Sequence, residues 1–181
     1  MLRKAILSLA LLSCSVWAGP KVAFETTLGS FTVELNEDKA PITVANFLKY
    51  VEDGSYEGTV FHRIIPGFMA QGGGFNQDMK MVKTYAPIKN EGNNGLSNNR
   101  ATISMARTNA PDSATRQFFI NLVDNDFLNY DARPPGYAVF GQVTTGFDVI
   151  QNMAKQPTSS FGRMRDVPET QIVITKAMLL D

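Results

Sequence analysis

Short β-like runs dominate this chain and restrict it to a mainly β fold. The first of them, "KVAFETTLGSFTVELN" at residues 21–36, alternates apolar and polar residues on both sides of "LG", which is typical of a β-hairpin with one buried face. Further β-like runs, separated by loops rich in Gly, Asn, Asp and Pro, occupy residues 59–65, 68–73, 101–107, 117–123, 137–145 and 170–180.

Two segments have helical rather than β periodicity. Residues 41–53 begin with Pro41 and carry Val44, Phe47 and Val51 on one helical face. A second helical segment, "GFDVIQNMAKQ", precedes Pro157. About eight strands with two helices, and no strand–helix alternation, predict a closed antiparallel barrel or a sandwich. At 181 residues and 44% hydrophobic, the chain is long enough for one such domain.

The first 18 residues have the pattern of a secretory leader. Arg3 and Lys4 precede the apolar run "AILSLALL", and small residues at Val16-x-Ala18 suit cleavage after Ala18. We therefore predict a signal peptide at residues 1–18 and one domain at 19–181, released into the periplasm of a bacterium. Cys14, the single cysteine, leaves an alternative in which "LLSC" is a lipoprotein cleavage site and the protein is lipid-anchored.

The charge balance disfavours a polyanionic partner. Lysine plus arginine equals aspartate plus glutamate at 17 each, and loss of Arg3 and Lys4 with the leader gives a net charge of −2. We expect no nucleic-acid binding. No stretch of the mature chain approaches the roughly 20 apolar residues of a membrane-spanning helix, so we also expect no stable membrane insertion.

Several common catalytic chemistries lack the residues they require. The chain has one histidine, His62, and no cysteine outside the leader, so neither a usual zinc ligand set nor a Cys–His pair can form. It has no G-x-S-x-G stretch, and we interpret His62 as structural. "QGGGF" lacks the lysine of a phosphate-binding loop and favours a tight turn instead. We expect no metal or cofactor.

Arg63 is the unusual residue of the β-like run "TVFHRII". An arginine on the inward face of a strand needs hydrogen-bonding partners, because a buried unpaired charge costs several kcal/mol. A turn at Pro66-Gly67 would place Gln71 beside Arg63 on the next strand. From the residues alone, this pair fits a structural bridge as well as a binding site.

Apolar residues that could line a pocket surround this pair. Adjacent Phe118 and Phe119 must face opposite sides of their strand, so both cannot belong to the core. A polar pair beside an apolar floor has the composition of a binding site. The candidate lining residues are Phe68, Met69, Met105, Phe118, Phe119, Phe127, Leu128 and Tyr137.

Three blocks of sequence resemble the signature blocks of the cyclophilins, the peptidyl-prolyl cis-trans isomerases. The blocks are "FHRIIPGFMAQGGGF", "ISMART" followed by "SATRQFFI", and "YAVFGQV", in the family's order. The resemblance covers residues 21–181 and is strongest to the bacterial periplasmic branch. It implies an eight-stranded antiparallel barrel closed by two helices, and an enzyme that rotates X-Pro peptide bonds without nucleophile, metal or cofactor.

The resemblance also implies roles for particular residues. Arg63 would be the central catalytic residue, with its guanidinium near the prolyl nitrogen, and Gln71 would orient it and contact substrate backbone. The proline ring would lie in a pocket of Phe68, Met69, Phe119 and Leu128. The peptide would lie along an edge formed by Ala106, Arg107 and Thr108, with Gln117 beside the groove.

Two positions depart from the family pattern. Phe127 stands where many members have tryptophan, and Tyr137 stands where they have histidine. We keep both as substrate-binding residues. Loss of the indole N–H at Phe127 predicts weak binding of cyclosporin-type ligands.

Two functions are compatible with these residues. The first is a monomeric isomerase acting on proline-containing polypeptides among unfolded or exported proteins, assisting their folding. The second is a chaperone module that binds proline peptides in the same groove without needing turnover. A secreted hydrolase is disfavoured by the missing triad.

Overall fold

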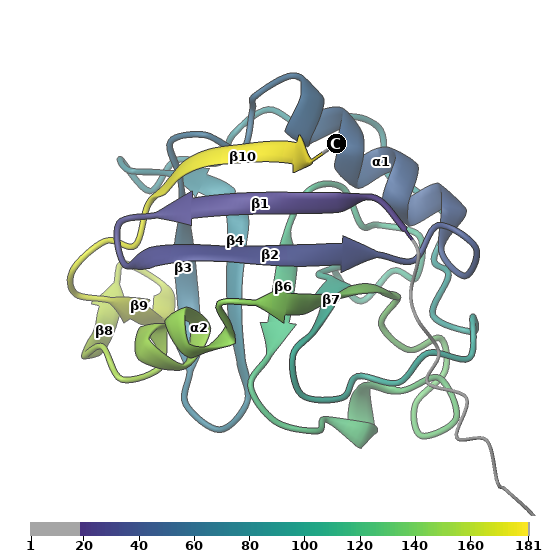
Figure 1. Ribbon diagram of the computed structural model, residues 1–181. Helices are drawn as coiled ribbons and strands as arrows, with labels where there is room; N and C mark the ends of the chain where they lie inside the picture. Colours follow the sequence, from purple (N-terminus) through teal and green to yellow (C-terminus); the bar gives the residue numbers. More distant parts are fainter. Residues whose placement is uncertain (1–18, 181) are drawn as a thin grey trace, which may run out of the picture.

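A curled eight-stranded antiparallel sheet forms most of the computed structural model, which describes residues 19–180 (Figure 1). The expected signal peptide and Cys14 lie outside the described residues. In spatial order the strands are β10 (Ile174–Leu180), β1 (Lys21–Thr26), β2 (Gly29–Leu35), β7 (Val139–Thr145), β5 (Thr102–Met105), β6 (Phe118–Asn121), β4 (Met69–Asn76) and β3 (Thr59–Ile65).

The two edge strands of this sheet, β10 and β3, meet over a short stretch. An isolated bridge joins Val60 to Val173, and the amide of Phe61 donates to the carbonyl of Ile172 at 2.9 Å. The ladder does not continue along the strands, so the sheet forms a half-barrel. The prediction of eight antiparallel strands is confirmed, although "closed" overstates how far the edges pair.

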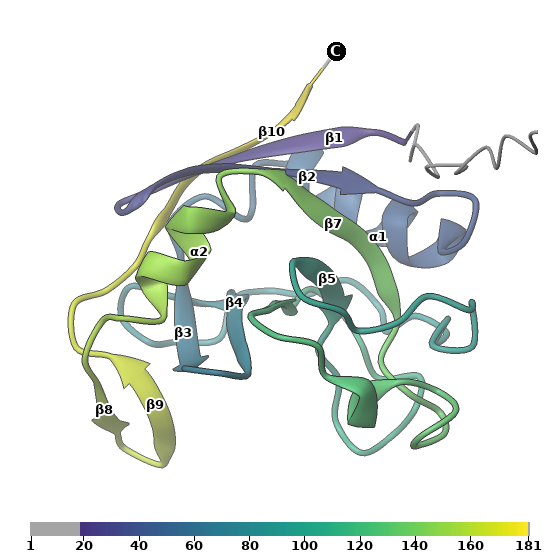
Figure 2. The same cartoon turned by 60° about the horizontal axis from the view of Figure 1, so that its bottom comes forward.

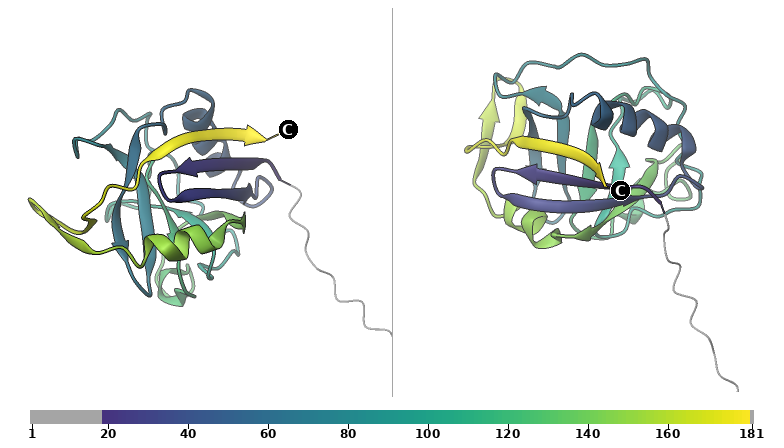
Figure 3. Two further views of the ribbon diagram at one scale, coloured as in Figure 1. Left: turned by 60° about the vertical axis from the view of Figure 1, so that its left-hand side comes forward. Right: turned by 45° about the horizontal axis from the view of Figure 1, so that its top comes forward.

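Two α-helices flank the sheet on different sides of strands β1, β2 and β10 (Figures 1 and 3). Helix α1 (Pro41–Glu52) begins at the predicted proline and buries Val44, Phe47 and Val51. Helix α2 (Phe147–Met153) packs near β2. None of the helices found between residues 19 and 180 has the length and apolarity that crossing a bilayer would require.

A small hairpin that the sequence analysis did not predict stands beside the main sheet. Its strands are β8 (Thr158–Phe161) and β9 (Met164–Pro168), which pair only with each other, and β9 lies next to β3 (Figure 2). Most side chains of β8 are exposed, so its sequence lacks the apolar alternation by which a half-buried strand is recognised.

Aromatic side chains fill the space between the curled sheet and α1. Phe24 and Phe31 stack with ring centroids 4.9 Å apart, and Phe118 contacts Phe47 edge-on at 5.8 Å. Such pairs contribute about 0.5–1.5 kcal/mol each beyond the area they bury. Because the core is built on the inner sheet face, alternate residues of β4 and β6 are left to face outward and form a separate surface.

Candidate active site

Arg63 and Gln71 face each other across the β3–β4 pair, as the sequence predicted. The turn between them contains Gly67 in a left-handed conformation, with φ of 71°. The side-chain amide of Gln71 donates to Oε1 of Gln117 at 2.9 Å. Within residues 19–180 no hydrogen bond joins Gln71 to the Arg63 guanidinium, so the expected orienting bond is absent from this structure.

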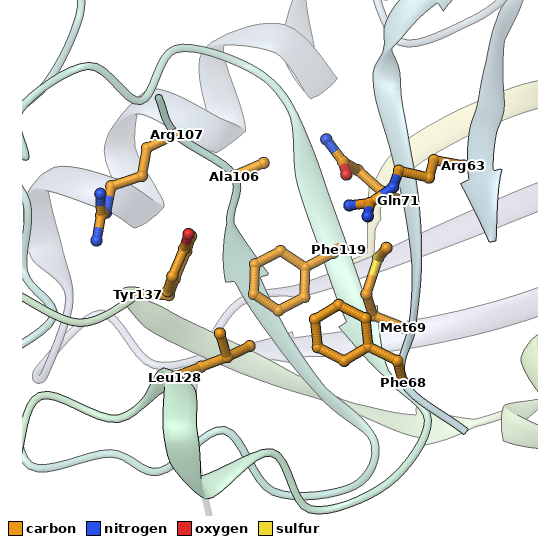
Figure 4. A pocket seen from close by; sticks show the side chains of 9 residues that line it. All are labelled: Arg63, Phe68, Met69, Gln71, Ala106, Arg107, Phe119, Leu128 and Tyr137. Carbon is orange, nitrogen blue, oxygen red and sulfur yellow. The ribbon is translucent and has the colours of Figure 1, made fainter. Parts of the chain in front are cut away.

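A pocket of about 230 Å³ opens beside this pair (Figure 4). Pockets for drug-sized ligands measure about 300–1,000 Å³, so this one suits a single small ring. Figure 4 shows Phe119 at its centre, with Arg63 and Gln71 on one side and Tyr137 and Arg107 on the other. Its lining residues are Arg63, Phe68, Met69, Gln71, Ala106, Arg107, Phe119, Leu128 and Tyr137.

Three of the predicted site residues lie beside the pocket rather than in its wall. Gln117 reaches it only through its hydrogen bond with Gln71. The amide and hydroxyl of Thr108 both engage Oγ of Ser113. Phe127 is 55% exposed and packs against the ring of Phe68, with ring centroids 5.5 Å apart.

The floor of the pocket is a small apolar cluster separate from the main core. Met69, Phe119 and Leu128 are buried in it, whereas the neighbouring Phe118 belongs to the main core. The prediction that Phe118 and Phe119 face opposite ways is therefore confirmed. Met105, which we also considered as lining, lies in the main core.

Tyr137 is held between two other side chains. Its ring packs edge-on against Phe119, with ring centroids 5.8 Å apart. The Arg107 guanidinium lies 4.4 Å from the Tyr137 ring centroid and makes a cation–π contact with it. Arg107 also donates from Nε to the carbonyl of Gly136 at 3.1 Å. These contacts fix the ring as one wall of the pocket.

The backbone next to this wall is free to pair with an extended peptide. Ala106 donates to the carbonyl of Gln117 at 2.9 Å, which continues the β5–β6 ladder. In the described part of the chain, neither the N–H nor the C=O of Arg107 takes part in a hydrogen bond. An unpaired donor and acceptor beside a pocket is the arrangement by which a peptide can add as a strand.

The glycines of "QGGGF" lie inside strand β4, so the prediction of a tight turn there is wrong. A Cβ on Gly74 would come within 2.4 Å of the Gln117 side chain, so the close approach of Gln117 requires glycine. The carbonyl of Gly73 accepts a hydrogen bond from Nε of Arg116 at 2.7 Å. Arg116 is 2% exposed and anchors the strand that carries Gln71.

A chain of buried asparagines supports the pocket from below. Asn125 donates to the carbonyl of Phe68 at 3.0 Å and to Oδ1 of Asn121 at 2.7 Å. Asn121 donates to Oδ1 of Asn98 at 3.3 Å, and Asn98 donates to the carbonyl of Tyr137 at 3.4 Å. Two walls of the pocket are therefore joined through three amides. These residues could not be predicted, because nothing in the local sequence distinguishes them from loop asparagines.

The charge of Arg63 interacts with two neighbours, Asp166 and His62. The guanidinium is partly exposed rather than buried, and its Nε lies 3.8 Å from Oδ2 of Asp166 on β9. On the opposite face, burial lowers the pKa of His62 to about 4, with the Arg63 charge acting in the same direction. Asp166 was not among the predicted site residues, because the hairpin that carries it was not predicted.

Among residues 19–180, no cluster of three or more His, Cys, Asp and Glu side chains could hold a metal ion. What the site offers is two guanidinium groups, amide donors and an apolar pocket beside an open backbone edge. It can bind an extended chain with one small ring inserted, and donate hydrogen bonds at the mouth of the pocket.

Comparison with known proteins gives one consistent family. Residues 21–179 match the family model described as cyclophilin type peptidyl-prolyl cis-trans isomerase/CLD. A peptidyl-prolyl cis-trans isomerase of Acinetobacter baylyi is 50% identical over 169 residues, covering 93% of this chain and 90% of the relative. Peptidyl-prolyl cis-trans isomerase B of Escherichia coli is 51% identical over 156 residues, covering 84% and 95%.

The fold also resembles that of a solved structure from the same family. The crystal structure of a cyclophilin type peptidyl-prolyl cis-trans isomerase from Cryptosporidium parvum superimposes with a TM-score of 0.73 at 25% sequence identity. The superposition covers 90% of this chain and 98% of that one.

Proposed function

This chain belongs to the cyclophilin-type peptidyl-prolyl cis-trans isomerases, and from that premise we propose that the pocket beside Arg63 is where it rotates X-Pro bonds of polypeptides. The observation that carries the proposal is the pocket itself. An arginine, an apolar ring-sized cavity and an unpaired backbone edge lie together on one face.

The reaction needs transition-state binding rather than bond chemistry. Rotation about a peptide bond meets a barrier of about 18–20 kcal/mol, because resonance between nitrogen and carbonyl is lost as the bond twists. Before proline, the two isomers are close in energy but interconvert over about tens to hundreds of seconds. An enzyme therefore accelerates the exchange if it binds the twisted amide better than either planar form.

In the proposed complex the proline ring enters the pocket above Phe119, and the residue before proline pairs with the backbone of Arg107. As the bond twists, the prolyl nitrogen regains its lone pair and becomes a better hydrogen-bond acceptor. The Arg63 guanidinium at the pocket mouth donates to it and stabilises the twisted state selectively. Gln71, held by Gln117, contacts the substrate backbone.

Replacing the arginine tests this mechanism directly. For Arg63→Ala we expect kcat/KM in a prolyl-peptide isomerisation assay to fall about 100-fold, equivalent to about 3 kcal/mol at the transition state. Because Arg63 is partly exposed and its removal leaves no buried partner unpaired, the far-UV circular dichroism and the thermal midpoint should be preserved.

A matched control separates the role of this arginine from a loss of positive charge. Arg133 is exposed in the loop before Tyr137, and Arg133→Ala should retain wild-type turnover. Wild-type turnover in Arg63→Ala would refute the proposed mechanism.

A chaperone that binds without turnover is not favoured, because the family and the relatives named above are isomerases. The same variant separates the two readings. An isomerase loses rate in Arg63→Ala while a chaperone function measured by suppression of aggregation survives. Equal loss of both would point to a binding role for the arginine.

We further propose that the protein is exported to the periplasm by a signal peptide at residues 1–18. The support is the pattern of Arg3, Lys4, the following apolar run and Val16-x-Ala18, together with a family match that begins at residue 21. The mass of the mature protein decides the matter. Cleavage after Ala18 leaves an unmodified chain beginning at Gly19, whereas the lipoprotein alternative leaves a lipidated N-terminal Cys14.

We also propose that the mature protein, residues 19–181, acts as a monomer on proline-containing polypeptides and does not bind nucleic acid. For the peptide substrate the support is the unpaired backbone donor and acceptor at the edge of the site, and for the lack of nucleic-acid binding it is the equal number of basic and acidic residues in the sequence. Sedimentation of the purified protein tests the monomer.

A further inference from the structure

The partner of Arg63 in this structure comes from outside the main sheet. Its Nε lies 3.8 Å from Oδ2 of Asp166, and both side chains are 42% exposed. This spacing is an ion-pair contact rather than a direct hydrogen bond. No hydrogen bond to the Arg63 guanidinium occurs within the described residues, and among them Asp166 is the one acidic side chain in an ion pair with it.

The backbone of Asp166 has an unusual conformation that serves this contact. Its φ is 60°, a left-handed conformation that residues other than Gly, Asn and Asp rarely adopt. The β8–β9 register also shifts here, between the pairs of Ser159 and Phe161 with their partners on β9. Such bulges change the direction in which a strand's side chains point.

The hairpin holds this carboxylate in place next to Arg63. The residue after Asp166, Val167, is 8% exposed and anchors β9, which lies along β3 (Figures 1 and 2). The carboxylate is thus presented by an anchored strand rather than by a loose loop. An unusual backbone conformation beside an active site supports a functional hypothesis when the surrounding structure fixes it.

We propose that Asp166 is a positioning residue for the isomerase reaction. By attracting the Nε side of the guanidinium, it directs the two terminal NH₂ groups of Arg63 toward the pocket and the prolyl nitrogen. Without the carboxylate, the half-exposed arginine samples more rotamers in solvent, and a smaller fraction of the enzyme has the donor in place. The inference rests on the proposed role of Arg63.

Two substitutions at this position separate the carboxylate from the fold. Asp166→Asn keeps the size and tolerates the left-handed backbone, and Asp166→Gly relieves that backbone entirely. We expect both to lower kcat/KM about three- to fivefold, the size of effect of a partly exposed ion pair. Thermal midpoints should stay at or above that of the wild type. Asp78→Asn, which removes an exposed ion pair with Lys80, is the matched control and should change nothing.

A double substitution shows whether Asp166 acts through Arg63. In the Arg63→Ala background, Asp166→Asn should cause no further loss of rate, because the group that it positions is already absent. If the same three- to fivefold loss persists there, Asp166 acts by another route and the proposal is wrong. Wild-type kcat/KM in the single variant Asp166→Asn would also overturn it.

A spectroscopic measurement tests the contact independently of activity. The ¹Hε–¹⁵Nε signal of Arg63, assigned by its loss in Arg63→Ala, should shift in Asp166→Asn and exchange faster with water, but stay unchanged in Asp78→Asn. An unchanged signal in Asp166→Asn would refute the pairing. If wild-type protein shows no isomerisation, the proposed function fails, while this signal still reports whether Asp166 holds Arg63.

Discussion

His62 and Arg63 are adjacent in β3 but have opposite environments. Arg63 faces the open groove, whereas His62 points to the other side, is 4% exposed and lies against the Phe75 ring at 4.6 Å. Within the described residues, Nδ1 of His62 is the one buried side-chain nitrogen or oxygen without a hydrogen-bond partner. Strand alternation therefore places the arginine at the open groove and buries the histidine, which agrees with the interpretation of His62 as structural.

His62 predicts a pH dependence of stability. Burial lowers its pKa from 6.5 to about 4, so between these values the unfolded chain takes up a proton that the folded protein does not. The free energy of unfolding should therefore decrease as pH falls from 6.5 to 4, by about 3 kcal/mol from this residue. Below pH 4 the folded protein also becomes protonated, and this contribution stops growing.

Urea unfolding at several pH values measures the effect. His62→Phe keeps an aromatic ring beside Phe75 and cannot titrate, so the stability difference between wild type and variant should change across this window. The carboxyl groups contribute equally to both proteins and cancel. A difference that is constant from pH 7 to pH 4 would show that His62 is not the group responsible.

At the scale of elements, sequence patterns predicted the structures that form between residues close together in the chain. The hairpin of β1 and β2, the start of α1 at Pro41 and the position of Gln71 opposite Arg63 follow from periodicity and from single turns. The β8–β9 hairpin could not be predicted in this way, because its exposed side chains do not alternate and its position is set by packing against β3. Asp166 was missed for the same reason.

The N-terminus of α1 is capped by a residue that lies far away in the sequence. Ala40 offers no capping side chain. Instead, the Glu91 carboxylate accepts hydrogen bonds from the amides of Ile42 and Thr43 at 3.1 and 2.8 Å, and from the Thr43 hydroxyl at 2.7 Å. A negative charge at this end is also favoured by the helix dipole. The contact fastens the long loop before β5 to the helix.

Glu91→Ala should therefore destabilise the protein without affecting turnover. Loss of a helix cap costs about 0.5–2 kcal/mol, so the midpoint of urea unfolding should fall while the m-value stays constant. Glu57 is exposed and its side chain makes none of the hydrogen bonds found in the described structure, so Glu57→Ala is the matched control. An unchanged midpoint in Glu91→Ala would mean that water replaces the cap at no cost.

The whole molecule combines a rigid sheet with a peripheral hairpin, and the site uses both. Gln71 and the floor residues Met69 and Phe119 belong to the eight-stranded sheet, whereas the charged neighbour of Arg63 belongs to the two-stranded one. Sequence blocks revealed the first part because its residues lie in a few contiguous segments. The asparagine chain and the hairpin connect segments far apart in the sequence, so they became visible only when the chain was folded.

The β8–β9 hairpin and the eight-stranded sheet should differ in local stability. A two-stranded hairpin depends on packing against other elements for its stability in water, and most side chains of β8 are exposed, whereas all four residues of β5 and of β6 are buried. In native-state hydrogen exchange, amides of β8 and β9 should therefore open with a free energy several kcal/mol below that of β5 and β6. Because β9 carries Asp166, Asp166→Asn should lower the protection of the hairpin further and leave that of β5 unchanged. Equal protection in the two sheets would mean that the hairpin unfolds only together with the eight-stranded sheet. Asp166 would then be held by the global fold rather than by the contacts of β9 along β3.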